Sequence, residues 1–244
     1  MNIKFKWSQL SLIWVGFLLV LSACAQSGSS GEVKTDQEQV DLQQADSVVA
    51  QITMGAGNLE VSGGAQSLME ADFTYNVDVW KPNVDYSVSQ GVGNLSVSQP
   101  ANIEIDRNLT NFRYDWNIRL SNDVPMDLRV DLGAGSSTLN IGSMDLTGLD
   151  VASGAGDIRV DLSGERGRDL GVTIRGGVGN LTVVLPSQAG VKVDVTGGLG
   201  QVVATGLTRN EQGSFVSPSY GTAEHTLVVD IEGGLGEVNL EVAQ

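Results

Sequence analysis

The chain has 244 residues, of which 29 are acidic and 14 are basic, and it contains one cysteine and one histidine. Its formal net charge of −15 argues against a nucleic-acid partner, because phosphate recognition requires clustered lysine and arginine. A single cysteine excludes a disulfide framework, and a single histidine excludes a multi-histidine zinc site. We therefore expect no metal, no cofactor and no nucleic acid.

Residues 1–23 predict an export signal. Lys4 and Lys6 form a basic start, and residues 10–21 form an apolar segment that is too short for a membrane-spanning helix of roughly 20 residues. Residues 21–24 read Leu-Ser-Ala-Cys, which resembles the lipobox of bacterial lipoproteins. The resemblance implies cleavage before Cys24, lipidation of Cys24 with acyl chains such as palmitate, and a membrane anchor on the extracytoplasmic face. An ordinary secretory signal with a chance cysteine is the alternative.

The segment after the signal predicts a tether. Residues 25–31 are rich in glycine and serine, and residues 32–44 are polar. We therefore expect a flexible tether over residues 24–44 and one folded domain over residues 45–244.

A Gly-apolar-Gly element recurs along the whole domain. Apolar residues two positions apart flank each copy on both sides, with polar residues between them, which is the pattern of half-buried strands. Each unit therefore predicts a strand, a glycine corner and a second strand, with the apolar corner residue pointing inward. The seven copies lie at residues 55–57, 91–93, 133–135, 154–156, 177–179, 198–200 and 234–236.

The spacing of the copies predicts an all-β architecture. Successive first glycines at 133, 154, 177 and 198 lie 21 to 23 residues apart, which favours solenoid rungs that each stack on the one before. A β-sandwich made of hairpins is the alternative. No long stretch after residue 46 has a helical period, so we expect almost no helix.

Four segments resemble the bacterial toast-rack domains, which are related to the C-terminal domains of cell-wall-active antibiotic response proteins and to adhesin-type domains. They are GAGNLEV at 55–61, WKP at 80–82, DWNIRL at 115–120 and PMDL at 125–128, and the resemblance covers roughly residues 45–242. It implies a single-stranded, right-handed β-helix-like fold and a cell-surface role in binding, sensing or scaffolding. It implies no catalytic residues. The chain departs from membrane-spanning members in that we expect a lipid anchor in place of transmembrane helices.

Aromatic residues gather in the first half of the domain. Four of them, Trp80, Phe112, Tyr114 and Trp116, are the candidate binding residues, because aromatic faces can stack on sugars or on a partner. The alternative is that these rings close the open end of the solenoid core.

Two pairs of aspartates, Asp127 with Asp131 and Asp157 with Asp161, are predicted to face outward. If neighbouring rungs brought members of the two pairs about 5–9 Å apart, they would suit glycoside hydrolysis. Weak Ca²⁺ binding is a second alternative. Because Arg129 and Arg159 lie between the acids, we favour a charge-compensated surface.

The single histidine, His225, lies close in sequence to Ser217 and Ser219. A serine–histidine–acid site is conceivable there, but we favour a solvated loop residue. We therefore expect a non-enzymatic, lipid-anchored surface domain for binding, adhesion or envelope-stress sensing, whose partner is a cell-wall polymer or a membrane protein. A carbohydrate-active β-helix enzyme is the alternative function.

Overall fold

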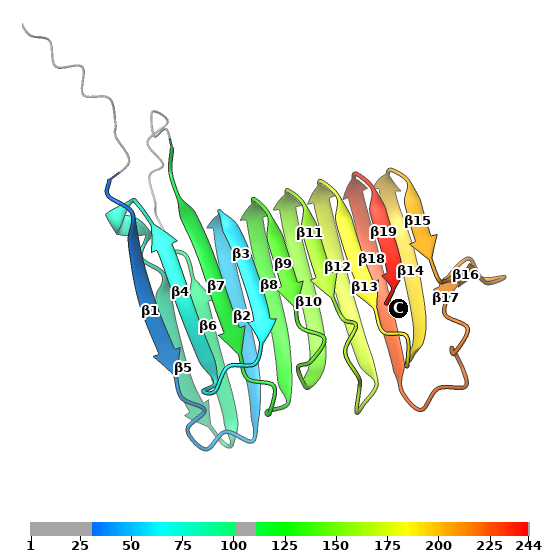
Figure 1. Cartoon of the computed structure of the whole chain (residues 1–244), viewed down its shortest axis with the longest axis horizontal. Helices are drawn as coiled ribbons and strands as arrows, with labels where there is room; N and C mark the ends of the chain where they lie inside the picture. Colours follow the sequence, from blue (N-terminus) through cyan, green and yellow to red (C-terminus); the bar gives the residue numbers. More distant parts are fainter. Residues whose placement is uncertain (1–30, 101–110, 244) are drawn as a thin grey trace, which may run out of the picture.

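The computed structural model describes residues 31–100 and 111–243, which form an all-β solenoid of two facing sheets. The strands of each sheet lie side by side along the long axis of the molecule (Figure 1). The only helical element in the described residues is a single 3₁₀ turn, η1 (Asp78–Trp80).

The first sheet has nine strands. Their spatial order is β1 (Lys34–Val40), β4 (Met69–Tyr75), β7 (Tyr114–Leu120), β3 (Asn58–Gly63), β9 (Ser137–Asn140), β11 (Ile158–Asp161), β13 (Leu181–Leu185), β19 (Val238–Val242) and β15 (Val202–Thr205).

The second sheet has ten strands. Their spatial order is β16 (Thr208–Arg209), β17 (Phe215–Val216), β14 (Gly190–Leu199), β18 (Thr226–Leu235), β12 (Leu170–Val178), β10 (Leu146–Ala155), β8 (Met126–Ala134), β2 (Ser47–Ala56), β6 (Val92–Ser98) and β5 (Asn83–Ser89).

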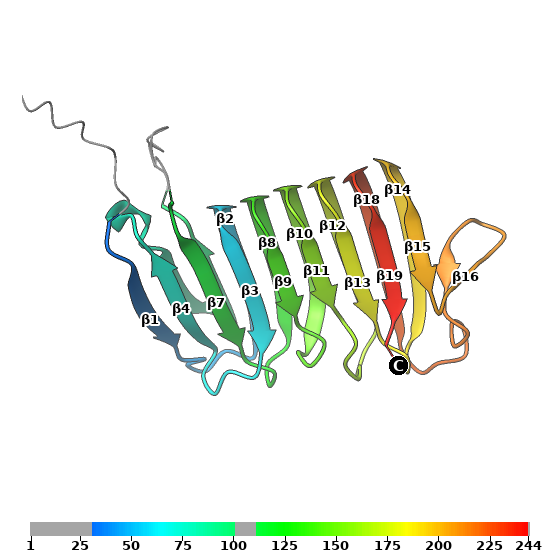
Figure 2. The same ribbon diagram turned by 45° about the horizontal axis from the view of Figure 1, so that its top comes forward.

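Six rungs form the body of the solenoid, and each consists of one strand from each sheet joined by a Gly-apolar-Gly corner. They stack in parallel in the order β2/β3, β8/β9, β10/β11, β12/β13, β18/β19 and β14/β15. Figure 2 shows the six corners along one edge of the molecule, where strands of the ten-stranded sheet end and their partners begin. The predicted solenoid is therefore confirmed, and the hairpin sandwich is not.

Close stacking explains why the corners need glycine. The second glycine, as in Gly156, has a φ of +127°, and a Cβ there would lie 1.8 Å from the carbonyl oxygen of Gly135 on the neighbouring rung. A Cβ on the first glycine, as in Gly177, would lie 1.8 Å from the carbonyl oxygen of Gly154. A side chain at either position would therefore force two rungs apart.

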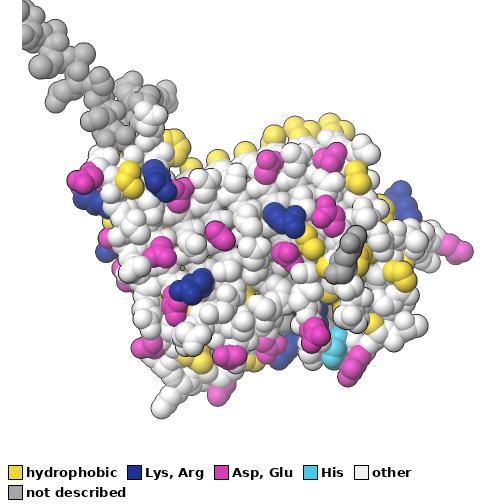
Figure 3. All heavy atoms as spheres, in the orientation of Figure 1, with side chains coloured by type: hydrophobic (Ala, Val, Ile, Leu, Met, Phe, Trp, Pro, Cys, Tyr) yellow, Lys and Arg dark blue, Asp and Glu magenta, His cyan; other side chains and the backbone are white. Residues whose placement is uncertain are grey.

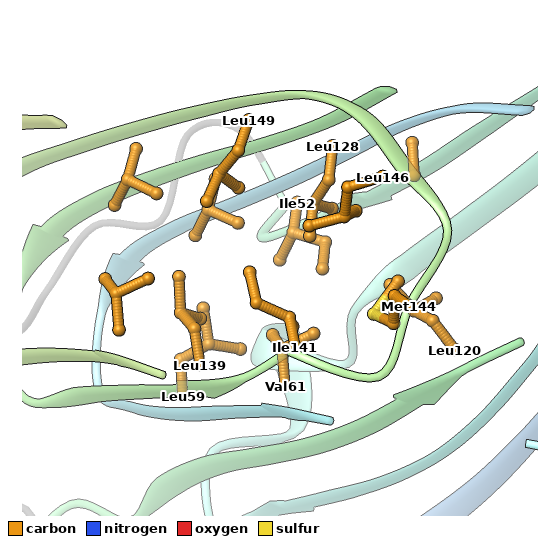
Figure 4. Close-up of a cluster of buried hydrophobic side chains, with 14 of the residues drawn as sticks. Ile52, Leu59, Val61, Leu120, Leu128, Leu139, Ile141, Met144, Leu146 and Leu149 are labelled. Carbon is orange, nitrogen blue, oxygen red and sulfur yellow. The ribbon is translucent and has the colours of Figure 1, made fainter. Parts of the chain in front are cut away.

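Alternating apolar residues of both sheets fill the space between them. Ile52 and Leu128 face Leu59 and Leu139 across the core, and all four are almost fully buried (Figure 4). Each fully buried aliphatic side chain of this size contributes roughly 1.5–3 kcal/mol. The stacked rungs therefore share one continuous aliphatic core.

The rung order departs from the prediction at the end of the repeat. The regular spacing predicted that the rung with Gly198 would stack on the rung with Gly177. Instead, the later rung β18/β19 lies between β12/β13 and β14/β15. The spacing did not reveal this order. The corner of β14/β15 has the same geometry as the other corners, but it stacks on the side of β18/β19 that faces away from β12/β13.

The copy at residues 91–93 forms a hairpin turn and not a solenoid corner, which corrects the prediction that every copy is a corner. β5 and β6 form an antiparallel hairpin within the ten-stranded sheet. Gln90 and Gly91 have φ values of 53° and 80°, and positive φ at both central residues is typical of a two-residue hairpin turn.

The tether prediction for residues 24–44 is also wrong in part. β1 pairs with β4 in antiparallel fashion from Lys34↔Tyr75 to Val40↔Met69, so the sheet begins eleven residues before the predicted start of the domain at residue 45. Backbone hydrogen bonds hold this edge strand in the sheet. Its side chains are mostly polar, so no alternating apolar pattern identifies it as a strand in the sequence.

Candidate functional site

The corner edge exposes the apolar residue of each corner, contrary to the prediction that it points inward. Leu199 is 79% exposed, Val178 is 56% exposed and Leu235 is 50% exposed. Each residue is the apex of a tight turn between two sheets, so its side chain points away from the core.

The six apex residues are in register. Paired across neighbouring strands, they form one line that we call the corner ridge, and in Figure 3 a row of hydrophobic side chains follows the same upper edge. Because neighbouring strands lie about 4.8 Å apart, the six positions span about 24 Å. The ridge consists, in spatial order, of Ala56, Ala134, Ala155, Val178, Leu235 and Leu199.

A ladder of hydrogen bonds fixes the corner ridge. The amide of Gly156 donates to the carbonyl of Val178 at 2.7 Å, and the amide of Gly179 donates to the carbonyl of Leu235 at 2.8 Å. Beside them, Asp157 Oδ1 accepts the amide of Asn180 at 2.9 Å. Asp157 therefore ties one corner to the next, which gives a structural reason for a carboxylate there.

The outer face of the nine-stranded sheet carries a shallow, open hollow of about 550 Å³. Its floor comes from four neighbouring strands, with Thr138 on β9, Arg159 on β11, Thr182 on β13 and Asn239 on β19. Hydroxyl, amide and guanidinium groups therefore converge from four rungs. Such a surface suits an extended ligand rich in hydrogen-bonding groups.

The aromatic binding platform predicted from the sequence does not form. Trp80, Tyr114 and Trp116 are buried, and only Phe112, at 49% exposure, is accessible. Tyr114 packs edge-to-face against both tryptophans at 5.3 and 5.4 Å, and burial raises its pKa. Three of the four candidate binding residues therefore belong to the core near the β1 end, which is the alternative that we considered.

The two aspartate pairs do not meet. Asp127 and Asp131 lie on β8 in the ten-stranded sheet, whereas Asp157 and Asp161 belong to the corner and strand β11 of the nine-stranded sheet. The carboxylate pair required by the glycosidase alternative is therefore not assembled from Asp131 and Asp161. Within residues 31–100 and 111–243, no group of three or more histidine, cysteine or acidic side chains could hold a metal ion.

The serines near His225 serve the loop in which they lie. Ser219 donates to the carbonyl of Ala189 at 2.7 Å, and Ser217 accepts the amide of Val191 at 2.9 Å. His225 Nε2 lies 4.0 Å from the carboxylate of Glu224. The hydroxyls are therefore engaged by the backbone, as expected for a structural loop.

The sequence and the geometry together assign the family. The model of the N-terminal domain of toast_rack, DUF2154, matches residues 29–184. The chain belongs to the toast-rack family. No curated protein matches this toast-rack chain.

One solved structure agrees with this assignment. A candidate cell adhesion protein from Clostridium sporogenes is 32% identical, and the alignment covers 87% of this toast-rack chain and all of the other, with a TM-score of 0.83. A candidate adhesin from Bacteroides fragilis is 11% identical, over 86% of this chain and 99% of the other, with a TM-score of 0.32. The first structure shares the whole toast-rack fold.

The toast-rack chain has two surfaces that the sequence reasoning missed, the corner ridge and the polar hollow. The growth of the corner residue from alanine to leucine along the chain was a visible signal for the ridge. Cys24 lies outside the described residues. No helix among those residues is long and apolar enough to cross a membrane.

Proposed function

We propose that this protein is a non-enzymatic binding module of the bacterial cell surface, lipid-anchored at Cys24, that adheres to a polysaccharide of the cell envelope. The cell-adhesion assignment of the 32% identical relative supports a surface-binding role. The sequence at residues 21–24 supports the anchor. The single observation that carries the proposal is the polar hollow on the nine-stranded sheet.

The hollow suits a polymer better than a small molecule. It is open to solvent and extends over four parallel strands, whereas small-molecule sites are usually concave and mostly apolar. Thr138, Thr182 and Asn239 offer donors and acceptors at the spacing of the strands, and Arg159 adds a planar set of donors. A hydroxyl-rich chain laid across the strands would meet a similar group at each rung.

The test is a binding assay with the full-length lipoprotein in detergent micelles and isolated envelope polysaccharide. We expect saturable binding that Arg159→Ala weakens by about tenfold, because one charge-assisted hydrogen bond contributes roughly 1.5–3 kcal/mol. Arg129→Ala is the matched control, because Arg129 is also an exposed strand arginine but lies on the opposite sheet.

Three results would contradict the proposal. Equal binding by both arginine variants would exclude the hollow as the site. No binding by the wild-type protein would exclude the polysaccharide and favour a membrane protein as partner. Release of new reducing ends from bound polymer would favour the carbohydrate-active alternative.

The anchor is tested separately through Cys24. We expect the mature protein to carry the mass of a lipid at its N-terminus and to stay in the membrane fraction after a high-salt wash. Cys24→Ser should remove both properties, because the lipid chains supply the membrane affinity. An unmodified Cys24 in the wild-type protein would refute the anchor without affecting the polysaccharide assay.

A further inference from the structure

The geometry points to a second role for the corner edge: the corner ridge rests on the lipid surface of the membrane that holds the anchor. The solenoid would then lie with its long axis along the membrane and its strands upright. This inference rests on the anchoring in the proposed function, and it adds a second, non-covalent contact with lipid.

The chemistry of the corner ridge favours lipid. Scattered exposed apolar residues are normal on protein surfaces, but an unbroken line of six in-register positions is not. Glycine flanks every apex, so no polar side chain interrupts the line, and no charge lies within the Gly-apolar-Gly triplets. The three largest side chains of the ridge, Val178, Leu235 and Leu199, are exposed at 50–79%.

Apolar side chains continue the ridge toward the first described residues. Phe112, at 49% exposure, lines a surface hollow together with Ala56 and Ala134, the first two members of the ridge. Trp80 packs edge-to-face against Phe112 at 5.5 Å, and the residue before it, Val79, is 67% exposed. Apolar side chains therefore extend the edge beyond the six corners.

The described chain starts at the same edge. The amide of Gly31 donates to the carbonyl of Asn76 at 2.9 Å, directly after β4, and Asn76 also bonds to the backbone of Arg113, beside Phe112. In Figure 1 the first described residues lie at the upper edge, where the corners also lie. The described chain therefore enters the fold on the side of the molecule that carries the corner ridge.

The distance to the anchor is short. Gly31 is seven steps along the chain from Cys24, and a fully extended chain spans at most about 3.6 Å per step, so Gly31 lies within about 25 Å of the anchored residue. This tether holds the ridge at a high effective concentration near lipid. The net charge of −15 opposes close approach to anionic headgroups, so the apolar side chains of the corner ridge are the part of the surface best suited to lie against the membrane.

The contact can be measured with single fluorophores on the full-length lipoprotein in phosphatidylcholine vesicles. A lipidated Cys24 accepts no label, so Leu199→Cys introduces one site on the ridge. Val203→Cys is the matched control, because Val203 is an exposed apolar residue of the same rung on the outer face of the nine-stranded sheet. Quenching by nitroxide groups on the lipid acyl chains then reports contact with the membrane.

We expect strong lipid quenching at position 199 and weak quenching at position 203. In a second experiment, Val178→Cys carries the fluorophore, and Leu199→Asn and Leu235→Asn are added together. We expect this double substitution to lower the lipid quenching at position 178 about tenfold or more, because two exposed leucines are lost. The anchor should still hold these variants on the vesicles.

Equal quenching at positions 199 and 203 would overturn the inference. So would shielding of position 199 from an aqueous quencher without lipid quenching, because a second copy or another protein would then cover the ridge. Labelling of the wild-type protein would refute the anchor alone. In that case the same comparison in a Cys24→Ser background decides the ridge, and absence of lipid quenching there overturns it.

Discussion

A methyl group at the glycine corner should destabilise the whole solenoid. In Gly156→Ala, the new Cβ would lie 1.8 Å from the carbonyl oxygen of Gly135, whereas an ordinary contact starts near 3.4 Å. The neighbouring rung would have to move by about 1.6 Å, which would strain two corner hydrogen bonds, from Gly156 to Val178 at 2.7 Å and from Gly135 to Ala155 at 2.9 Å. At about 1 kcal/mol for each bond and about 1–2 kcal/mol for the positive φ, the cost is about 3–4 kcal/mol.

Urea unfolding followed by circular dichroism measures this cost. Gly171→Ala is the matched control, because Gly171 lies in the neighbouring strand β12 and a Cβ there meets nothing within 4 Å. We expect the control to be neutral or stabilising by up to about 1 kcal/mol, since glycine weakens a strand. If Gly156→Ala lowers the free energy of unfolding by less than about 1 kcal/mol relative to Gly171→Ala, close backbone stacking is not what requires glycine.

Three further results follow from the same structure. Trp116→Ala should lower the free energy of unfolding by about 3–5 kcal/mol, whereas Phe112→Ala should cost less than about 1 kcal/mol, and thermal melting of both variants separates a core ring from an exposed one. Burial and a 2.7 Å hydrogen bond to Asp36 raise the pKa of Tyr75 to about 12, so the stability that Tyr75 contributes is complete below its ordinary pKa of about 10 and is lost as the pH rises toward about 12. Tyr75→Phe should flatten this alkaline loss in urea titrations. The same hydrogen bond lowers the pKa of Asp36, so its contribution is present above the ordinary pKa of about 4 and disappears as the pH falls through the lowered value, and an unchanged acid titration in Tyr75→Phe would refute this coupling.

Much of the fold could be predicted because two local signals agree. Alternating apolar residues identify the strands, and a Gly-apolar-Gly triplet between two such strands identifies a turn from one sheet to the other. Ser137 occupies the buried position that Ile158 occupies on the next strand, so the strand after the corner at 133–135 is in register with its neighbour although its first buried residue is polar. The order of the rungs could not be predicted, because every corner offers the same backbone surface to every other corner.

The candidate site was harder to predict than the strands. Periodicity identifies Tyr114 and Trp116 as alternating residues on one face of β7, but it does not tell whether that face is buried or exposed. β4 and β3 flank β7 within the nine-stranded sheet, and the face that carries Tyr114 and Trp116 is the buried one. The corner residues were assigned to the core because apolar residues are usually buried, whereas Leu199 and Leu235 lie at turn apices outside it. The polar hollow has no sequence signature, because four rungs each contribute one ordinary strand residue.

The placement of β18/β19 between two earlier rungs affects the order in which the protein can assemble during synthesis. β8/β9, β10/β11 and β12/β13 pair with neighbours about one rung away in sequence, so these contacts can form early. β14/β15 is made before β18/β19, yet its parallel partners are β18 and β19 alone. It can therefore join the stack only after β18/β19 has been made and has packed between it and β12/β13. A chain interrupted before Thr226 would leave the rung β14/β15 without a parallel neighbour.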